Sequence, residues 1–132
     1  MWDEELERAR YVSLATFKRN GDEVRLPIWF APDPDEAGLL WMYTNRSSFK
    51  VKRLRRDSRA RVAACDVRGN VHGAWFDARG IVHDEEGSEE FERGLAVVQA
   101  RYGWQMSAVV LASRIGGRYR DRCALAIRLA AS

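Results

Sequence analysis

Cationic side chains are concentrated in one stretch of this chain, residues 43–63, with the sequence YTNRSSFKVKRLRRDSRARVA. Its single acid is Asp57, and its cations are Arg46, Lys50, Lys52, Arg53, Arg55, Arg56, Arg59 and Arg61. Ser47 and Ser48 precede a helix-compatible run, and serine is a preferred N-cap residue. A helix that starts there points free backbone N–H groups and the positive end of its dipole outward. The pattern therefore predicts an anion-binding site, with a phosphate group as the simplest ligand.

Hydrophobic residues within the same stretch indicate how this helix is anchored. Val51 and Leu54 form an apolar stripe, whereas Lys50 and Arg53 lie beside the start of the helix. A basic helix is most often a solvated surface, so composition alone does not establish phosphate binding. An alternative is that the cluster Arg46–Arg61 binds the phosphate backbone of a nucleic acid, because small antiparallel barrels also bind such ligands.

Residue types that catalyse reactions directly do not form a recognisable set. His72 and His83 have no histidine or carboxylate at metal-ligand spacing, so no metal site is expected. Cys65 and Cys123 are far apart and form no CxxC motif, so we expect two buried hydrophobic residues rather than a disulfide or zinc ligands. No nucleophile can be matched to a base from spacing, and the catalytic residues stay unknown.

Length and composition favour one globular domain over residues 1–132. The chain is 46% hydrophobic, enough to build its own core, and its formal net charge of +3 says little about partners. No stretch approaches the roughly 20 apolar residues of a membrane-spanning helix, and the acidic start MWDEELERARYV lacks a signal-peptide pattern. We therefore expect a soluble, cytoplasmic protein without a membrane partner.

Hydrophobic periodicity predicts short strands joined mostly by tight turns. Asn20-Gly21 is typical of a hairpin turn, and Pro27 places its strand at a sheet edge or bulge because proline cannot donate a hydrogen bond. The expected strands cover residues 11–17, 23–31, 39–44, 61–66, 71–83 and 123–129. The expected helices cover 2–10, the basic run after Ser48, and 85–102 with Gly103 as its cap, while 107–115 fits either state. This order is not a βαβ series, so it favours a mainly β fold, a small antiparallel barrel with peripheral helices.

Several of these segments together resemble a known family. They are YVSLATFKRNG, RLPIWFA, WMYTNRSSFKVKRLRRDSRARVA, CDVRG and WFDARGIV, and they extend from around Tyr11 to Asp84. In this order they are similar to the FMN- and F420-binding split-barrel proteins, the group that includes the pyridoxamine 5'-phosphate oxidase-like proteins. The resemblance implies an antiparallel split β-barrel. It also implies a homodimer whose cofactor sites lie at the subunit interface.

The resemblance also implies roles for individual residues. The strand over residues 26–29 is expected to lie along the tricyclic ring of the cofactor, and residues 43–44 to contact the cofactor. Ser48 and Lys50 match the Ser-x-Lys pair that binds the phosphate, and Lys52 and Arg53 are expected to hold the phosphate with them. The implied cofactor-binding set is Leu26, Pro27, Ile28, Trp29, Tyr43, Thr44, Ser48, Lys50, Lys52 and Arg53.

Two departures separate the chain from the FMN-dependent oxidases of the group, which carry a lysine at the position of Phe30 and a further basic residue at that of Phe49. The pattern PIWFA followed by SFKVKRLRR is more similar to the actinobacterial branch that binds coenzyme F420. The expected function is hydride transfer between reduced F420 and an unidentified small organic substrate, for which the protein supplies binding and orientation rather than a catalytic motif. The alternatives are an FMN-binding reductase or oxidase, the nucleic-acid-binding barrel, and a cofactor carrier without catalytic activity.

Overall fold

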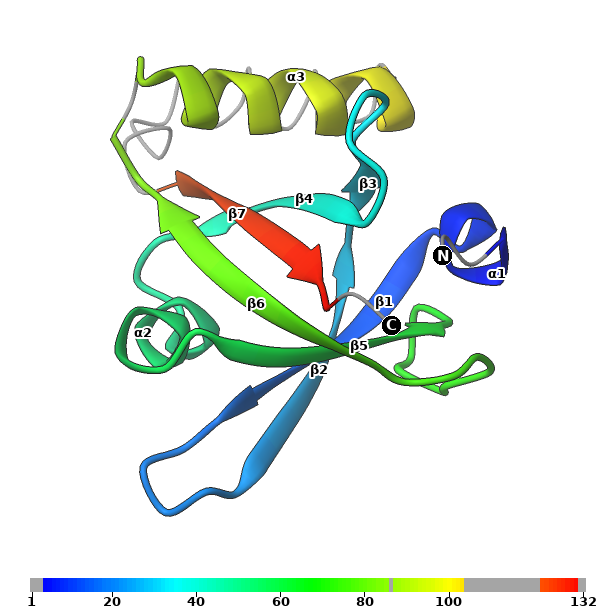
Figure 1. Ribbon diagram of the computed structural model, residues 1–132, viewed down its shortest axis with the longest axis vertical. Helices are drawn as coiled ribbons and strands as arrows, with labels where there is room; N and C mark the ends of the chain where they lie inside the picture. Colours follow the sequence, from blue (N-terminus) through cyan, green and yellow to red (C-terminus); the bar gives the residue numbers. More distant parts are fainter. Residues whose placement is uncertain (1–3, 86, 104–121, 131–132) are drawn as a thin grey trace.

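A computed structural model describes residues 4–85, 87–103 and 122–130 of the chain. Within these ranges, seven strands form one antiparallel sheet that curls into a split barrel, with helices on its outside (Figure 1). In chain order the elements are α1 (Glu4–Arg8), β1 (Tyr11–Phe17), β2 (Glu23–Trp29), β3 (Ala31–Pro32), β4 (Leu39–Asn45), α2 (Phe49–Arg56), β5 (Arg59–Cys65), β6 (Phe76–His83), α3 (Glu89–Tyr102) and β7 (Arg122–Leu129). The expected mainly β, antiparallel split-barrel fold is confirmed.

The sheet closes because one continuous segment, residues 23–32, contributes both of its edges. The strand order is β2-β1-β5-β6-β7-β4-β3, so β2 and β3, which are adjacent in the chain, stand at opposite ends of the sheet. β2 pairs with β1, and β3 pairs with β4 after a break at Phe30. The strand predicted over residues 23–31 is therefore two strands. Pro27 lies opposite Ser13 in the edge strand β2, which confirms its predicted edge position.

The break at Phe30 is held by the hydroxyl group of Tyr102, the last residue of α3. This hydroxyl accepts a hydrogen bond from the Phe30 backbone N–H at 3.0 Å. Its own proton is shared between the carbonyl oxygens of Phe30, at 2.6 Å, and Arg10, at 2.7 Å. The Tyr102 ring also stacks on Trp29, with ring centroids 4.8 Å apart and planes at 16°. One side chain therefore links α3, the sheet break and the residue before β1.

Two hydrophobic cores lie on the two faces of the sheet. The first fills the barrel and includes Val51 and Leu54 of α2, as predicted, and Leu6 of α1. The second lies between the outer face of the sheet and α3, which crosses β4 and β7 (Figure 1). Gly94 permits this close approach, because a Cβ atom there would lie 2.6 Å from Cε3 of Trp41.

The strand expected over residues 71–83 is shorter in the structure, where β6 begins at Phe76. Before it the chain turns around Asp66, whose carboxylate accepts hydrogen bonds from the backbone N–H groups of Arg68 and Asn70. Such a side chain competes with the sheet for backbone donors, so the regular pairing of β5 with the following segment is interrupted.

The long helix also starts later than expected, because α3 begins at Glu89 rather than at residue 85. Ser88 is its N-cap, and the Ser88 hydroxyl accepts a hydrogen bond from the Phe91 N–H at 3.2 Å. At the other end, Gly103 follows the last helical residue with a positive φ of 61°, and its N–H bonds back into the final turn. The predicted glycine cap is confirmed.

Both cysteines are buried, as expected, and burial raises the pKa of the Cys65 and Cys123 thiols to about 11. Within the described ranges, no helix is long and apolar enough to cross a membrane. The stretch 107–115, for which the sequence fits either helix or strand, lies outside the described residues, as does Trp2 of the expected first helix.

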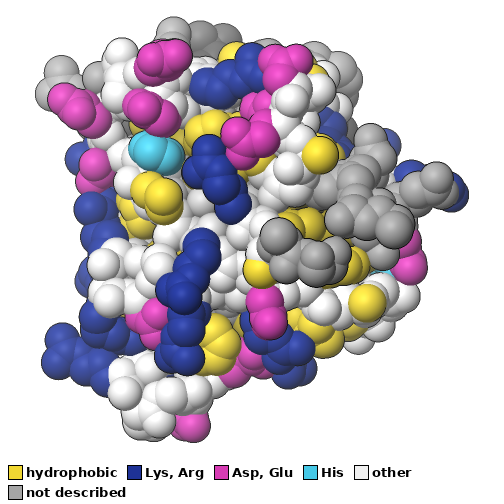
Figure 2. Space-filling view, in the orientation of Figure 1, with side chains coloured by type: hydrophobic (Ala, Val, Ile, Leu, Met, Phe, Trp, Pro, Cys, Tyr) yellow, Lys and Arg dark blue, Asp and Glu magenta, His cyan; other side chains and the backbone are white. Residues whose placement is uncertain are grey.

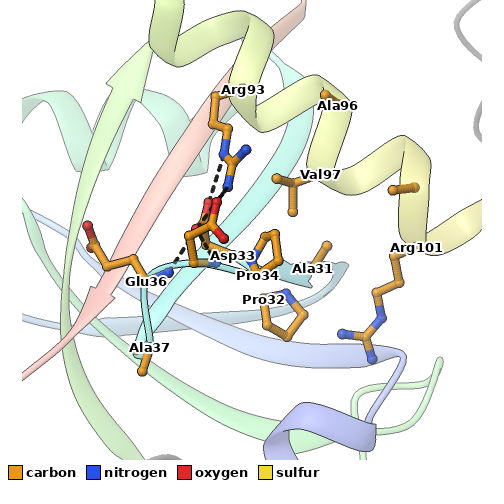
Figure 3. Close-up of a pocket in the computed structure, with 13 residues that line it drawn as sticks. Ala31, Pro32, Asp33, Pro34, Glu36, Ala37, Arg93, Ala96, Val97 and Arg101 are labelled. Atoms are coloured by element: carbon orange, nitrogen blue, oxygen red, sulfur yellow. Dashed lines mark hydrogen bonds and ion pairs between the residues drawn. The ribbon is translucent and has the colours of Figure 1, made fainter.

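A buried acid, Asp33, anchors the loop between β3 and β4. Its side chain is 5% exposed and accepts hydrogen bonds from the indole N–H of Trp41 at 3.0 Å and from the Arg93 guanidinium of α3 (Figure 3). The backbone N–H groups of Asp35 and Glu36 donate to the same carboxylate. Burial raises the pKa of Asp33, but these hydrogen bonds outweigh it and lower the pKa from 3.8 to about 2.

We expect Tyr102→Phe to lower the free energy of unfolding by about 1–3 kcal/mol, because the Phe30 N–H at the sheet break loses its partner. Denaturant unfolding followed by circular dichroism measures this. Tyr11→Phe is the control, because the Tyr11 hydroxyl has no hydrogen-bond partner among the described residues. That change should cost less than about 0.5 kcal/mol. Equal losses in the two variants would show that the hydroxyl does not hold the break.

Acid should weaken the fold through Asp33. Its pKa lies below the unfolded value of 3.8, so its contribution to stability is complete above that value and is lost as the pH falls toward 2. The shift corresponds to about 2 kcal/mol between roughly pH 6 and pH 2. We expect Asp33→Asn to be less stable than the parent at neutral pH and to lose about 2 kcal/mol less on acidification. Parallel pH profiles of the two unfolding free energies would contradict this.

Candidate functional site

The start of α2 forms the helix terminus that the sequence predicts. Ser48 is the N-cap, with extended backbone angles of φ −67° and ψ 154°. Its hydroxyl makes no capping hydrogen bond, and within the described part of the chain the buried Oγ has no hydrogen-bond partner. The preceding turn is fixed by Asn45, whose side-chain oxygen accepts hydrogen bonds from the Ser47 N–H at 2.9 Å and the Ser47 hydroxyl at 2.7 Å. A hydroxyl with unused hydrogen-bonding capacity therefore remains at the helix start.

Lys50, the second residue of α2, is half-buried. Burial lowers the pKa of Lys50, and the positive charges of Arg53 and Arg122 lower it further. Among the described residues no carboxylate pairs with its ammonium group. An anion bound beside Lys50 would relieve both effects, because it supplies the missing counter-charge.

An aromatic pocket of about 290 Å³ is lined in part by Arg122, whose charge acts on Lys50. Its lining residues are Tyr11, Pro27, Ile28, Trp29, Tyr43, Val98 and Arg122. Residues 27–29 and Tyr43 are predicted cofactor contacts, and the fold brings them into one pocket although they lie on different strands. None of the described lining residues is acidic. The pocket is therefore suited to a flat ligand that is neutral or negatively charged.

Arg122 connects the pocket to α2. It is the first residue of β7 and pairs in register with Asn45, just before the turn that leads into α2. Its guanidinium carbon lies 6.0 Å from the centroid of the Tyr43 ring. Sequence reasoning missed Arg122 because strand periodicity identifies the buried run after it but not the strand with which it pairs. In the sequence Arg122 is recognisable only as a cation directly before a predicted strand. That pattern is common and does not reveal which residues surround the side chain in the fold.

Two of the predicted phosphate ligands have other contacts. Arg53 donates a hydrogen bond from Nε to the hydroxyl of Thr16 on β1 at 2.6 Å. Lys52 is exposed, and its ammonium group lies 5.2 Å from the centroid of the Phe49 ring. Helical geometry explains the position of Lys52, because residues two apart on a helix face different directions. Arg53 lies on the same face as Lys50, but its guanidinium is bound to Thr16. Lys50 is the member of the predicted trio for which the described residues provide no partner, and Arg122 lies within its electrostatic range.

Two of the predicted ring contacts do not line the pocket. Successive residues of a strand face opposite sides of a sheet, so Thr44 is buried on the barrel side, whereas Tyr43 packs on the side of α3. Leu26 is 41% exposed on the edge strand β2.

The other cations of the predicted basic cluster have separate partners. The ion pairs are Arg55–Asp84 at 2.5 Å, Arg59–Asp57 at 2.8 Å and Arg61–Glu23 at 3.0 Å. Arg46 and Arg56 donate to backbone carbonyl oxygens of Asp84 and Phe17. Figure 2 shows Lys and Arg side chains interspersed with Asp and Glu on the face that it views. Most cations of the cluster therefore have partners within the described part of the chain, which reduces the charge that they offer to a nucleic-acid backbone.

A larger cavity, of about 810 Å³, lies between α3 and the loop that Asp33 anchors (Figure 3). Pro32 and Val97 contribute to its apolar floor. Arg93 lies at its rim and is already paired with Asp33 and Asp35. This cavity shares no lining residue with the aromatic pocket and contains none of the predicted site residues. It is separate from the candidate cofactor site.

Comparison with solved structures shows the same fold in proteins of low identity. HutZ, the heme storage protein from Vibrio cholerae, is 12% identical, with 98% of this chain and 87% of that chain covered and a TM-score of 0.71. A protein named F420 Reductase is 16% identical, with 98% and 94% covered and a TM-score of 0.57. A protein of unknown function from Agrobacterium tumefaciens is 17% identical with a TM-score of 0.68; the match covers 95% of this chain, which spans 50% of that protein. At these identities the likeness shows the fold alone.

Comparison with family models identifies the chain more closely. No curated protein matches it. The family model described as pyridoxamine 5'-phosphate oxidase matches residues 2–130, nearly the whole chain. The curled antiparallel sheet agrees with that match. The chain therefore belongs to the pyridoxamine 5'-phosphate oxidase family.

Proposed function

We propose that this chain binds a phosphate-bearing deazaflavin or flavin, coenzyme F420 as the first candidate, and that it transfers a hydride between this cofactor and a small organic substrate. The observation that carries the proposal is the half-buried ammonium of Lys50, which has no carboxylate partner among the described residues and lies within electrostatic range of Arg122, a lining residue of the aromatic pocket. A phosphate group beside α2 would receive hydrogen bonds from Lys50 and from the unused hydroxyl of Ser48. It would also face the positive end of the helix dipole.

The roles of the other residues follow from their positions. When bound, the cofactor supplies the hydride chemistry, and the protein binds and orients it. Residues 27–29 and Tyr43 form the wall along which the ring would lie, and Leu26 extends the same strand. Thr44 supports that wall from the barrel side. Lys52 and Arg53 would contribute positive charge at longer range, because their head groups already have other contacts.

Charge favours F420 over FMN. Arg53 lies within electrostatic range of Lys50, and neither cation is paired with a carboxylate in the described ranges. The phosphate and acidic tail of F420 bring more negative charge than the single phosphate of FMN. One protein of similar fold is named an F420 reductase. FMN is the second candidate, because the family includes FMN-binding oxidases.

We also propose a homodimer with the cofactor site at the subunit interface. Val67 and Val71 are 61% and 39% exposed in the loop after β5. That loop adjoins the edge strand β2, because a Cβ atom on Gly69 would lie 3.6 Å from Cδ of Pro27. Exposed apolar side chains next to an edge strand and a ligand pocket mark a surface that a second copy would cover.

Lys50→Ala should weaken the binding of F420 or FMN about ten- to hundredfold, because it removes a charge-assisted hydrogen bond worth about 1.5–3 kcal/mol. The variant without cofactor should be at least as stable as the parent, since alanine is the better helix former and a half-buried charge is lost. Fluorescence or calorimetric titration of F420, FMN, FAD and haem against one preparation measures the affinities.

Lys18→Ala, in the exposed hairpin after β1, is the matched control and should bind as the parent does. If Lys50→Ala retains the parent's affinity for both F420 and FMN, the phosphate site lies elsewhere. Tighter binding of FMN than of F420 would reassign the cofactor. Preferential binding of haem would remove the hydride-transfer proposal.

Sedimentation of the parent at low micromolar concentration should give twice the chain mass of 15.1 kDa. Val67→Asp should shift the equilibrium toward the monomer, because it places a charge on the apolar surface next to β2. Ile81→Asp, at a position on β6 that is also exposed, is the control. A monomer that binds the cofactor with the parent's affinity would contradict a site shared between subunits.

A further inference from the structure

The aromatic pocket has walls that are fixed by their neighbours. Tyr11 and Trp29 are paired in register on β1 and β2, and their rings meet edge to face with centroids 6.3 Å apart. Trp29 is also held by its stack on Tyr102, and Tyr43 meets Phe91 edge to face at 6.2 Å. Because these rings are positioned by packing, a flat ligand could enter without much loss of side-chain freedom.

Arg122 is the one charged group among the described lining residues. It is half-buried, its guanidinium lies near the Tyr43 ring, and no carboxylate pairs with it in the described part of the chain. Lys50 is a second cation within electrostatic range, and the two repel each other. A single phosphate beside Lys50 would leave the charge of Arg122 at the pocket uncompensated.

We propose that this pocket selects flat aromatic ligands that carry a negative charge on the ring system itself, and that Arg122 is the residue that selects them. The inference rests on the proposed function in one respect: Lys50 and Ser48 take the phosphate, which leaves Arg122 for a second anionic group. A planar oxyanion such as a ring carboxylate suits a guanidinium, which binds it through two parallel hydrogen bonds. The chemical class of the ring ligand is thus an aromatic carboxylate or a comparable ring-borne anion.

The test compares 2-naphthoate with 2-naphthylmethanol, two flat probes of similar size that differ in charge, on the protein without added cofactor. Ligand-observed NMR titration should show naphthoate binding about tenfold more tightly than the alcohol. Arg122→Gln should remove this preference and leave the affinity for the alcohol unchanged. Arg122→Lys should keep part of the preference, because it keeps the charge but not the planar fork. Arg68→Gln, which changes an exposed arginine after β5, is the control and should leave the preference for naphthoate unchanged.

Equal affinity of the parent for the two probes, or no binding of either, overturns the inference. A preference that survives in Arg122→Gln also overturns it. If FMN displaces naphthoate, the two ligands use the same pocket, as the inference requires. If both bind independently, naphthoate lies elsewhere and the inference fails. A different result tests the proposed function. If that function is wrong, Lys50→Ala leaves the affinities for F420 and FMN unchanged, and this outcome does not depend on whether naphthoate binds. Thermal unfolding of each variant verifies that the fold is retained.

Discussion

The hydroxyl group of Tyr102 holds the sheet at the point where its two edges meet. A barrel made from a sheet must satisfy its edge strands, and here one segment of chain serves both edges by changing its partner at Phe30. That change leaves the backbone of Phe30 without strand pairing, and the Tyr102 hydroxyl bonds both its N–H and its carbonyl. The same ring stacks on Trp29, so the closure of the barrel also sets a wall of the aromatic pocket.

Electrostatic pairing decides which cations remain available for a ligand. Most of the basic cluster is engaged by carboxylates, hydroxyls or backbone carbonyls among the described residues. Pairs of this kind are exposed and contribute little to stability, but they remove charge from the surface field. Lys50 and Arg122 are not paired with acids in the described residues: Arg122 lies within electrostatic range of Lys50, and its guanidinium carbon lies 6.0 Å from the centroid of the Tyr43 ring. Burial of Lys50, together with its repulsion by Arg53 and Arg122, makes an anion favourable there.

The split barrel supports more than one chemistry. Proteins of similar fold include one named for heme storage and one named an F420 reductase, each sharing less than a fifth of its residues with this chain. Membership of the family therefore leaves the ligand to local side chains. In this chain those side chains are aromatic walls fixed by packing, a helix start with an unused Ser48 hydroxyl, and two cations without counter-charges in the described ranges. Together they are the basis for proposing a flat, phosphate-bearing and anionic ligand.

The sequence by itself determined the features that depend on neighbours in the chain. Alternation identified the β strands, Val51 and Leu54 marked the buried side of α2, and Pro27 indicated an edge strand, because each rests on local geometry or on a missing donor. The tertiary structure decided where the long strand breaks at Phe30, which cations find partners, and that Arg122 joins the pocket. These depend on strand register and on contacts between residues far apart in the chain, which periodicity does not encode.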